Sequence, residues 1–157
     1  MTHRFPEKTA LFPGTFNPFT RGHMSVARRA LELFDRLVIG VGFSPAKPES
    51  AANAQQRAQR IGQLFADDPR VEAIAYSGLT IDVCRDCGAR FIVRGVRSVA
   101  DFEYERNLAD VNRQIGGIET VLLYSLPGDA AISSSMVREL ESHGVDVTPF
   151  LPQNSQK

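Results

Sequence analysis

The stretch Thr9–His23 reads TALFPGTFNPFTRGH and predicts a strand that runs through a tight loop into a helix. The apolar run Thr9–Phe12 is typical of a buried strand, and Gly14 allows close approach to the backbone after it. A helix that starts directly after such a loop offers free N–H groups and the positive end of its dipole to an anion. The stretch therefore predicts the first strand and helix of an α/β sheet, with a phosphate cradle between them.

The rest of the chain repeats this alternation of apolar runs and helical segments. The expected strands are Thr9–Phe12, Arg36–Val41, Val71–Tyr76, Arg90–Val93 and Thr120–Tyr124. The expected helices are Gly22–Phe34, Ala54–Phe65, Ile81–Cys87, Val99–Ile115 and Ser134–Ser142, with Ser44–Asn53 as a surface loop. The pattern predicts an α/β fold: a Rossmann-like, doubly wound sheet of five mainly parallel strands with flanking helices. Ligands of such sheets bind beyond the carboxyl ends of the strands.

The charges are balanced, with 18 Lys and Arg residues against 18 Asp and Glu residues among 157. Proteins that hold nucleic acid or an anionic membrane by electrostatics show a basic excess, so we expect neither partner. The longest apolar run, Leu37–Phe43, has 7 residues, far fewer than the roughly 20 that span a bilayer. With a polar N-terminus and two cysteines, the chain is expected to be one cytoplasmic domain, residues 1–157.

Basic groups follow several of the expected strands. His23 presents an imidazole at the start of the first helix, Lys47 follows the second strand, and Arg94 and Arg97 follow the fourth. Ammonium and guanidinium groups suit phosphate oxygens. We therefore expect these four side chains to meet in one phosphate-rich pocket, with the acidic residues elsewhere. The alternative is an ordinary set of solvated surface charges.

Two helices carry polar groups on the side expected to face this pocket. Ser133–Ser135 begin the last helix, where hydroxyls can cap it and leave N–H groups for a polyphosphate. In the helix Val99–Ile115, a stripe that mixes polar and apolar side chains is formed by Asp101, Glu105, Leu108, Asn112 and Ile115. A purely structural helix would fill such a stripe with apolar side chains, so we expect it to line the site at its N-terminal end. A solvated face is the alternative.

The pair Cys84-x-x-Cys87 does not predict a metal or redox site. Zinc would need two further ligands at partner spacing, which His3, His23 and His143 do not provide. A redox motif would stand at the start of a helix, whereas this pair is expected in the last turn. We expect no metal site built by the protein itself.

Five segments together resemble the nucleotidylyltransferases that carry a T/H-x-G-H signature, most closely the phosphopantetheine adenylyltransferase family. These segments are Thr20-Arg21-Gly22-His23, Ser44-Pro45-Ala46-Lys47, Ile92–Glu105, Asn112-Arg113 and Ile132–Arg138. The resemblance runs from Leu11 to about Pro152. It implies reversible transfer of AMP from ATP to 4′-phosphopantetheine, which gives dephospho-coenzyme A and pyrophosphate in coenzyme A biosynthesis.

The resemblance also implies roles for individual residues. The catalytic residues would be His23, Lys47 and Arg97. The acceptor would be bound by Thr15, Lys47, Thr80, Arg94 and Asn112. ATP would be bound by Thr15, Phe16, His23, Gly95, Val96, Arg97, Glu105, Asp129, Ala130, Ala131, Ile132, Ser133, Ser134 and Ser135. Mg²⁺ would accompany ATP, the assembly would be a homohexamer, and dephospho-coenzyme A and coenzyme A would bind as product or inhibitor.

The sequence departs from the family pattern at two places. Asn17 stands where the G-T-F-D-P string has Asp, which removes a negative charge beside the site. The segment Gly128–Ala131 lacks the aromatic residue that many members carry before the serines. Two alternatives stay open: another nucleotidylyltransferase, of the nicotinate-mononucleotide or cytidylyl type, or a non-catalytic nucleotide-binding module.

Overall fold

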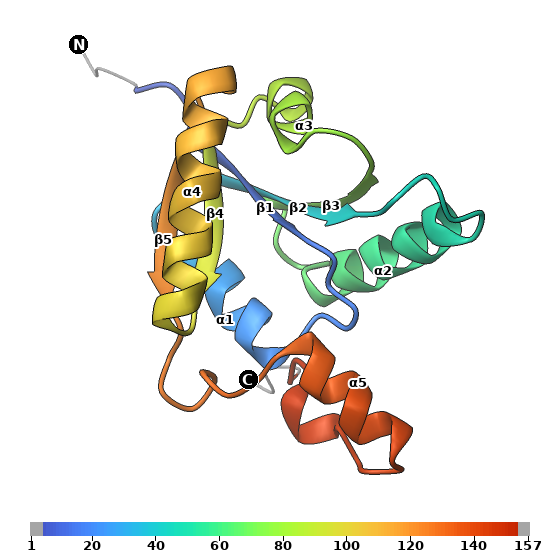
Figure 1. The fold of residues 1–157 in the computed structure, drawn as a ribbon. Coiled ribbons are helices and arrows are strands. Elements are labelled where there is room, and N and C mark those ends of the chain that lie inside the picture. The colour runs from blue at the N-terminus through green and yellow to red at the C-terminus, as the bar shows by residue number, and fades with distance from the viewer. Residues whose placement is uncertain (1–4, 154–157) are drawn as a thin grey trace.

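Five parallel strands form one sheet in the computed structural model, which describes residues 5–153. Their order across the sheet is β3-β2-β1-β4-β5 (Figure 1). The strands are β1 (Thr9–Gly14), β2 (Arg36–Gly42), β3 (Val71–Tyr76), β4 (Phe91–Val96) and β5 (Glu119–Tyr124). The predicted Rossmann-like sheet is confirmed, and every pairing is parallel.

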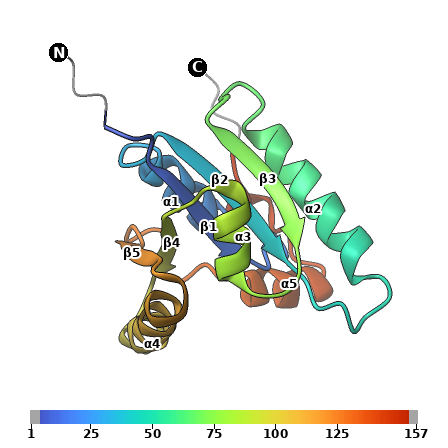
Figure 2. The ribbon, with the colours of Figure 1, turned by 90° about the horizontal axis from the view of Figure 1, so that it is seen from above.

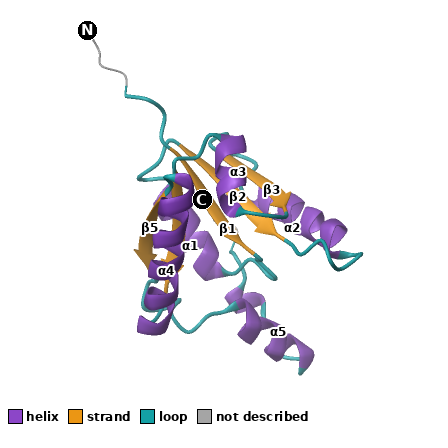
Figure 3. Cartoon of the chain, turned by 45° about the horizontal axis from the view of Figure 1, so that its top comes forward, coloured by secondary structure: helices purple, strands orange, loops and turns teal. Residues whose placement is uncertain are grey.

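Helices cover both faces of the sheet. They are α1 (Arg21–Ala30), α2 (Ser50–Leu64), α3 (Thr80–Cys87), α4 (Val99–Gly116) and α5 (Ser134–Ser142), and a 3₁₀ turn, η1 (Thr148–Phe150), follows. Figure 2 shows α1 and α2 on one face and α3 and α4 on the other. In Figure 3, α5 lies beyond the edge of the sheet rather than on a face. Within residues 5–153, no helix combines the length and the apolar character needed to cross a membrane.

Each face of the sheet has its own apolar core. Side chains of alternating residues point to opposite faces of a strand, so Phe12 packs with α1 and α2 while its neighbour Leu11 packs with α3. The central strands are buried on both sides, which explains why β2 reads as a continuous apolar run. Gly88 and Gly117 end α3 and α4 with φ values of 73° and 66°, a left-handed conformation that glycine adopts without strain.

Three expected boundaries differ from the structure by at least three residues. β4 continues to Val96, so Arg94 and Gly95 lie in the strand, because backbone pairing with β5 extends beyond the apolar run. The helix α2 begins at Ser50, inside the expected loop, since its exposed first turn lacks the apolar period. The helix α1 ends at Ala30, and the turn after it keeps Leu31 and Phe34 in the core without helical geometry.

The strands β1 and β4 are neighbours only near their amino ends. β1 pairs with β2 along its whole length, but with β4 only at Ala10↔Phe91 and Leu11↔Ile92. This is the point where the strand order reverses, which is the usual ligand site of an open α/β sheet. The divergence of the two strands leaves their carboxyl ends free to line a site.

Replacement of Gly40 should destabilise the protein. A Cβ at this buried position of β2 would lie 2.9 Å from Cε1 of Tyr76 and 3.2 Å from Cδ1 of Leu11. We expect Gly40→Ala to lower the free energy of unfolding by about 1–3 kcal/mol, as overpacking does, in urea denaturation. The control is Gly62→Ala, whose Cβ would meet only Ala73 at 3.9 Å and should stabilise α2 by about 0.5–1 kcal/mol. Equal stabilities of the two variants would contradict this packing.

Candidate active site

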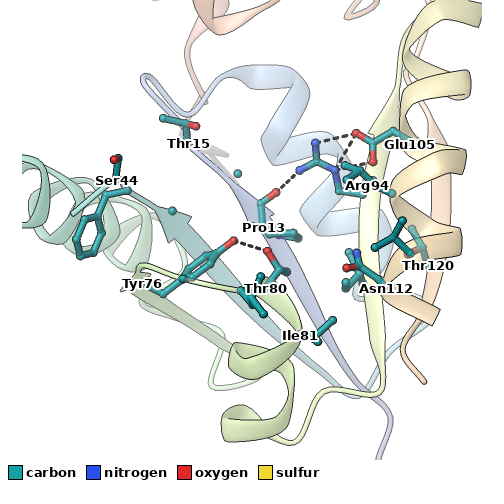
Figure 4. A pocket seen from close by; sticks show the side chains of 18 of the residues that line it. Pro13, Thr15, Ser44, Tyr76, Thr80, Ile81, Arg94, Glu105, Asn112 and Thr120 are labelled. Carbon is teal, nitrogen blue, oxygen red and sulfur yellow. Dashed lines mark hydrogen bonds and ion pairs between the residues drawn. The ribbon is translucent and has the colours of Figure 1, made fainter. Parts of the chain in front are cut away.

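Two adjoining cavities lie at the carboxyl ends of β1 and β4. The first cavity has a volume of about 890 Å³ and extends between α2, α3 and α4 (Figure 4). The second cavity has a volume of about 440 Å³ and is lined by the starts of α1 and α5. The residues that line both cavities are Pro13, Gly14, Thr15, Arg94 and Glu105. Two ligands bound side by side would therefore meet at this shared wall.

Arg94 builds the shared wall by joining β1 to α4. Its Nη2 donates to Oε1 of Glu105 at 2.8 Å, and its Nε lies 3.0 Å from both carboxylate oxygens. Its Nη1 donates to the carbonyl oxygen of Pro13 (Figure 4). Glu105 is only 5% exposed, so its charge needs this partner. Each terminal nitrogen of Arg94 keeps a second N–H, which can reach a phosphate oxygen.

His23 is fixed by the helix cap that the T-x-G-H sequence forms. Thr20 is the N-cap residue of α1, and its Oγ1 accepts the backbone N–H of His23. In return, the backbone N–H of Thr20 donates to Nδ1 of His23 at 2.9 Å. This capping box makes Nδ1 an acceptor, so the proton of a neutral imidazole is carried by Nε2. The side chain thus lines the second cavity as a hydrogen-bond donor.

The surroundings of His23 keep its imidazole uncharged. The rings of Phe12, Phe16 and Phe19 lie with their centroids 5.0–6.3 Å from that of His23. Burial, followed by the positive charges of Arg94 and Arg97, lowers the pKa of His23 from 6.5 to about 4. A neutral donor close to two guanidinium groups is suited to a phosphoryl oxygen that gains negative charge.

Phe16 holds an unusual backbone conformation next to this site. Its φ of 49° lies in the left-handed region, which non-glycine residues rarely adopt. The conformation turns the ring back over Gly14, where a Cβ would lie 2.9 Å from the ring. Gly14 is therefore required by Phe16, rather than by a ligand alone as we expected.

The serines that begin α5 have distinct tasks. Ser133 is the N-cap residue and accepts the backbone N–H of Met136 at 3.1 Å, which confirms the predicted cap. Ser134 donates its hydroxyl to the carbonyl oxygen of Pro18 at 2.8 Å and so ties α5 to the loop after β1. The first turns of α1 and α5 both line the second cavity, which gives it two helix N-termini suited to an anion.

The mixed stripe of α4 lines the cavities along its whole length, not only at the N-terminal end that we expected. Asp101 reaches the second cavity, Glu105 reaches both, and Leu108, Asn112 and Ile115 line the first. One side of α4 therefore forms a wall along the whole length of the site.

The residues expected to bind an acceptor all line the first cavity. They are Thr15, Lys47, Thr80, Arg94 and Asn112. Thr120 adds a hydroxyl that is buried and has no hydrogen-bond partner within the described part of the chain (Figure 4). Polar groups are thus distributed along a mixed polar and apolar groove that could follow an elongated ligand.

Most of the residues expected to bind ATP line the second cavity. The exceptions are Val96, whose side chain is buried, and Ala130 and Ala131, which lie outside the lining. The expectation of a single basic pocket is wrong, because Lys47 lines the first cavity whereas His23 and Arg97 line the second.

The expectation that acidic residues lie elsewhere is also wrong. Asp101, Glu105 and Asp129 all line the second cavity, each beside an arginine. Asp101 accepts the backbone N–H of Arg97 and lies 3.8 Å from its guanidinium group. Asp129 is paired with Arg21 at 2.9 Å. Sequence reasoning did not see these pairs, although only the pair of Arg21 and Asp129, 108 residues apart, joins distant segments.

Sequence reasoning missed two further residues of the first cavity. Tyr76 lies against Gly40 and Gly42 of β2, and its hydroxyl lies 3.1 Å from that of Thr80 (Figure 4). Arg57 of α2 donates from Nε to the carbonyl oxygen of Thr15 at 3.1 Å. The glycines opposite Tyr76 were the one available signal, since they leave room for its ring.

The cysteine pair lies away from both cavities. Cys84 and Cys87 are free and lie in α3, where burial raises the pKa of Cys84 to about 12. A thiol with such a pKa is unreactive. No cluster of three or more His, Cys, Asp or Glu residues suited to a metal occurs within residues 5–153; His3 lies outside that range.

Comparison with known sequences points to one group of enzymes. A cytidylyltransferase-like family model matches residues 11–140. A phosphopantetheine adenylyltransferase of Phocaeicola vulgatus is 53% identical over 146 residues, which cover 93% of this chain and 96% of that protein. A second, from Bacteroides thetaiotaomicron, is 44% identical over 149 residues, covering 95% of this chain and 98% of that protein.

Comparison with solved structures supports the fold. A bifunctional NMN adenylyltransferase/ADP ribose pyrophosphatase from Francisella tularensis is similar with a TM-score of 0.68 at 17% identity, over 95% of this chain and 46% of that one. A putative nicotinate-nucleotide adenylyltransferase from Vibrio parahaemolyticus is similar with a TM-score of 0.61 at 18% identity, over 94% of both chains.

His23 should stay neutral well below pH 6.5. Its imidazole should titrate with a pKa of about 4 in an NMR experiment. The unfolded chain takes up this proton near 6.5, but the folded protein does so only near 4. The contribution of His23 should therefore lower the free energy of unfolding as the pH falls through this window. A His23 signal that titrates near 6.5 would show that the imidazole is not desolvated.

Proposed function

The chain belongs to the cytidylyltransferase-like family and, within it, to the phosphopantetheine adenylyltransferases, and on that basis we propose that it transfers the adenylyl group of ATP to 4′-phosphopantetheine. A phosphate oxygen of the acceptor forms a bond to the α-phosphorus of ATP while the bond to the leaving pyrophosphate breaks. The products are dephospho-coenzyme A and pyrophosphate. The observation that carries the proposal is the 53% identity over 93% of the chain to an enzyme of that name.

The two cavities suit the two substrates of this reaction. The second cavity, with two helix N-termini, His23 and Arg97, is suited to the polyphosphate of ATP. The first cavity would hold the acceptor, with its phosphate near Lys47 and Arg94 and its arm near Thr80 and Asn112. The attacking and leaving groups would then meet at the shared wall. In-line transfer of this kind relies on positioning and charge stabilisation rather than on a covalent intermediate.

His23 is suited to stabilise the transition state. Its Nε2–H group is held in place by the cap and stays available at neutral pH, because its pKa is lowered to about 4. A fixed donor aimed at an oxygen that gains charge is more effective than one that must reorient. Arg97 and Lys47 would balance charge on the pyrophosphate and the acceptor phosphate.

Mg²⁺ would be held mainly by the nucleotide. The second cavity contains the carboxylates of Asp101, Glu105 and Asp129, but each lies beside an arginine within the described residues. These groups do not offer a free set of ligands, so phosphate oxygens and water would supply most of the coordination. The ion would supply charge neutralisation of the polyphosphate.

The alternatives left open by the sequence are not favoured. Eight curated relatives at 40–53% identity carry the name phosphopantetheine adenylyltransferase. The nicotinate-type enzymes are similar in fold at 17–18% identity.

The proposal extends to assembly and location. We treat residues 1–157 as one nucleotidylyltransferase domain and expect a homohexamer. Exposed apolar side chains on α4 and β5 support association of copies, among them Val99, Tyr104 and Tyr124 at 77%, 61% and 76% exposure. The free cysteines suit a reducing cytoplasm. Coenzyme A would compete with the substrates as a product-like ligand. Light scattering, which measures the mass of the assembly, tests the homohexamer.

An acceptor panel tests the reaction. Pyrophosphate release from ATP should require 4′-phosphopantetheine as acceptor. It should be negligible when nicotinate mononucleotide replaces this acceptor, and also when CTP replaces ATP. A labelled α-phosphate should appear in dephospho-coenzyme A. Absence of release with phosphopantetheine at saturating ATP would refute the proposed function.

The variant His23→Ala should lose turnover rather than substrate binding. Loss of one transition-state donor lowers kcat by about 10²–10³, while the affinity for ATP should change little. His143→Ala, an exposed histidine after α5, is the matched control and should keep its kcat. Equal losses in kcat and ATP affinity would contradict the role given to His23.

A further inference from the structure

Arg21 ties together three segments around the second cavity. It is the first residue of α1, two positions before His23. Its Nε donates to Oδ1 of Asp129 at 2.9 Å, and its Nη2 donates to the carbonyl oxygen of Gly128 at 2.8 Å. Its Nη1 donates to the carbonyl oxygen of Pro149 at 3.2 Å, in η1. One guanidinium group thus holds the segments before and after α5.

The attachment of α5 makes these bonds important. In Figures 1 and 3, α5 lies beyond the edge of the sheet, away from the two layers that cover its faces. Within residues 5–153, its other polar links to the protein run from Ser134 to Pro18 and from Arg138 to Asn17, both in the loop after β1. The serines at the start of α5 are therefore positioned by side-chain bonds to the segment Asn17–Arg21 together with the packing of the buried side chains Ile132 and Val137.

Asp129 gives Arg21 a second task. This carboxylate lines the second cavity and the residue is only 8% exposed. An uncompensated negative charge there would repel a polyphosphate. A Cβ added to Gly22 would lie 3.8 Å from Cβ of Asp129, which shows how closely this residue approaches the start of α1.

We propose that Arg21 is a positioning residue for the nucleotide: it neutralises Asp129 and holds the start of α5 against α1, so that the second cavity accepts a polyphosphate. Asp129 then acts through Arg21 and does not contact the nucleotide itself. The identity of the nucleotide as ATP rests on the proposed function, but the bonds of Arg21 do not.

The variant Arg21→Met tests this role. In calorimetric titration without acceptor, we expect ATP binding to weaken on the order of tenfold, as for loss of a partly desolvated charge pair. The KM for phosphopantetheine and the kcat at saturating ATP should stay within about threefold. Arg28→Met, an exposed arginine of the same helix, is the matched control and should bind ATP as the unmodified protein does.

The partner variant separates the two possible roles of Asp129. Asp129→Asn alone should change ATP affinity by less than about threefold. In the Arg21→Met background it should restore part of the lost affinity, because the unpaired charge is gone while the bonds to Gly128 and Pro149 stay lost. Additive losses in the double variant would show that Asp129 contacts the nucleotide and would overturn the proposal. Unchanged ATP affinity in Arg21→Met would also overturn it.

Two further measurements keep the outcome clear. Circular dichroism and thermal unfolding without ligand establish that each variant is folded. The variant Arg21→Lys keeps the positive charge but lacks the planar guanidinium group, and it should bind ATP more tightly than Arg21→Met. If Arg21→Met does not fold, the ATP affinities of Arg21→Lys and Asp129→Asn decide. Weaker ATP binding by Arg21→Lys with near-normal binding by Asp129→Asn supports the proposal. Near-normal binding by Arg21→Lys with weaker binding by Asp129→Asn overturns it. ATP binding is measured without acceptor, so failure of phosphopantetheine turnover would leave this test intact.

Discussion

The ion pair of Arg94 and Glu105 is the interaction on which the site depends. β1 and β4 pair at only two positions, and the side chain of Arg94 then spans the space between β1 and α4. Removal of one partner from such a buried pair typically costs about 3–5 kcal/mol, because the other charge is left without compensation. The same bonds that hold α4 to the sheet also form the wall between the two cavities. A substitution of Arg94 or Glu105 should therefore change both the stability of the fold and the shape of the two cavities.

The sequence was informative wherever structure follows from local pattern. Apolar runs located all five strands, because buried strands are built from apolar residues. Gly88 marked the end of its helix, because the left-handed backbone at that position favours glycine. The T-x-G-H string was also readable, since a capping box spans four consecutive residues. The mixed stripe of α4 pointed to a ligand-facing side for the same reason.

The rest depended on contacts between different elements of the fold, some of them far apart in the chain. Arg94 looked like a free phosphate ligand, and its partner Glu105 on the next helix was assigned to ATP. Asp129 likewise gave no sign of its pairing with Arg21, 108 residues away. The division into two cavities depends on how β1 and β4 diverge, which no residue type encodes. Charge totals could not show that the acidic side chains enter the site with arginines beside them.

Among the eighteen residues of α4, all of them described, Glu105 is the one that is buried. A helix without an apolar buried face gains little from the hydrophobic effect, which is the usual source of helix docking energy. Its inner side instead faces the first cavity, with Leu108 and Ile115 among the lining residues. The apolar part of an elongated ligand would bury this inner side of α4, as core side chains do for other helices. The helix would then be packed fully only when the cavity is occupied. Occupancy of the cavity and the rigidity of α4 are then thermodynamically linked.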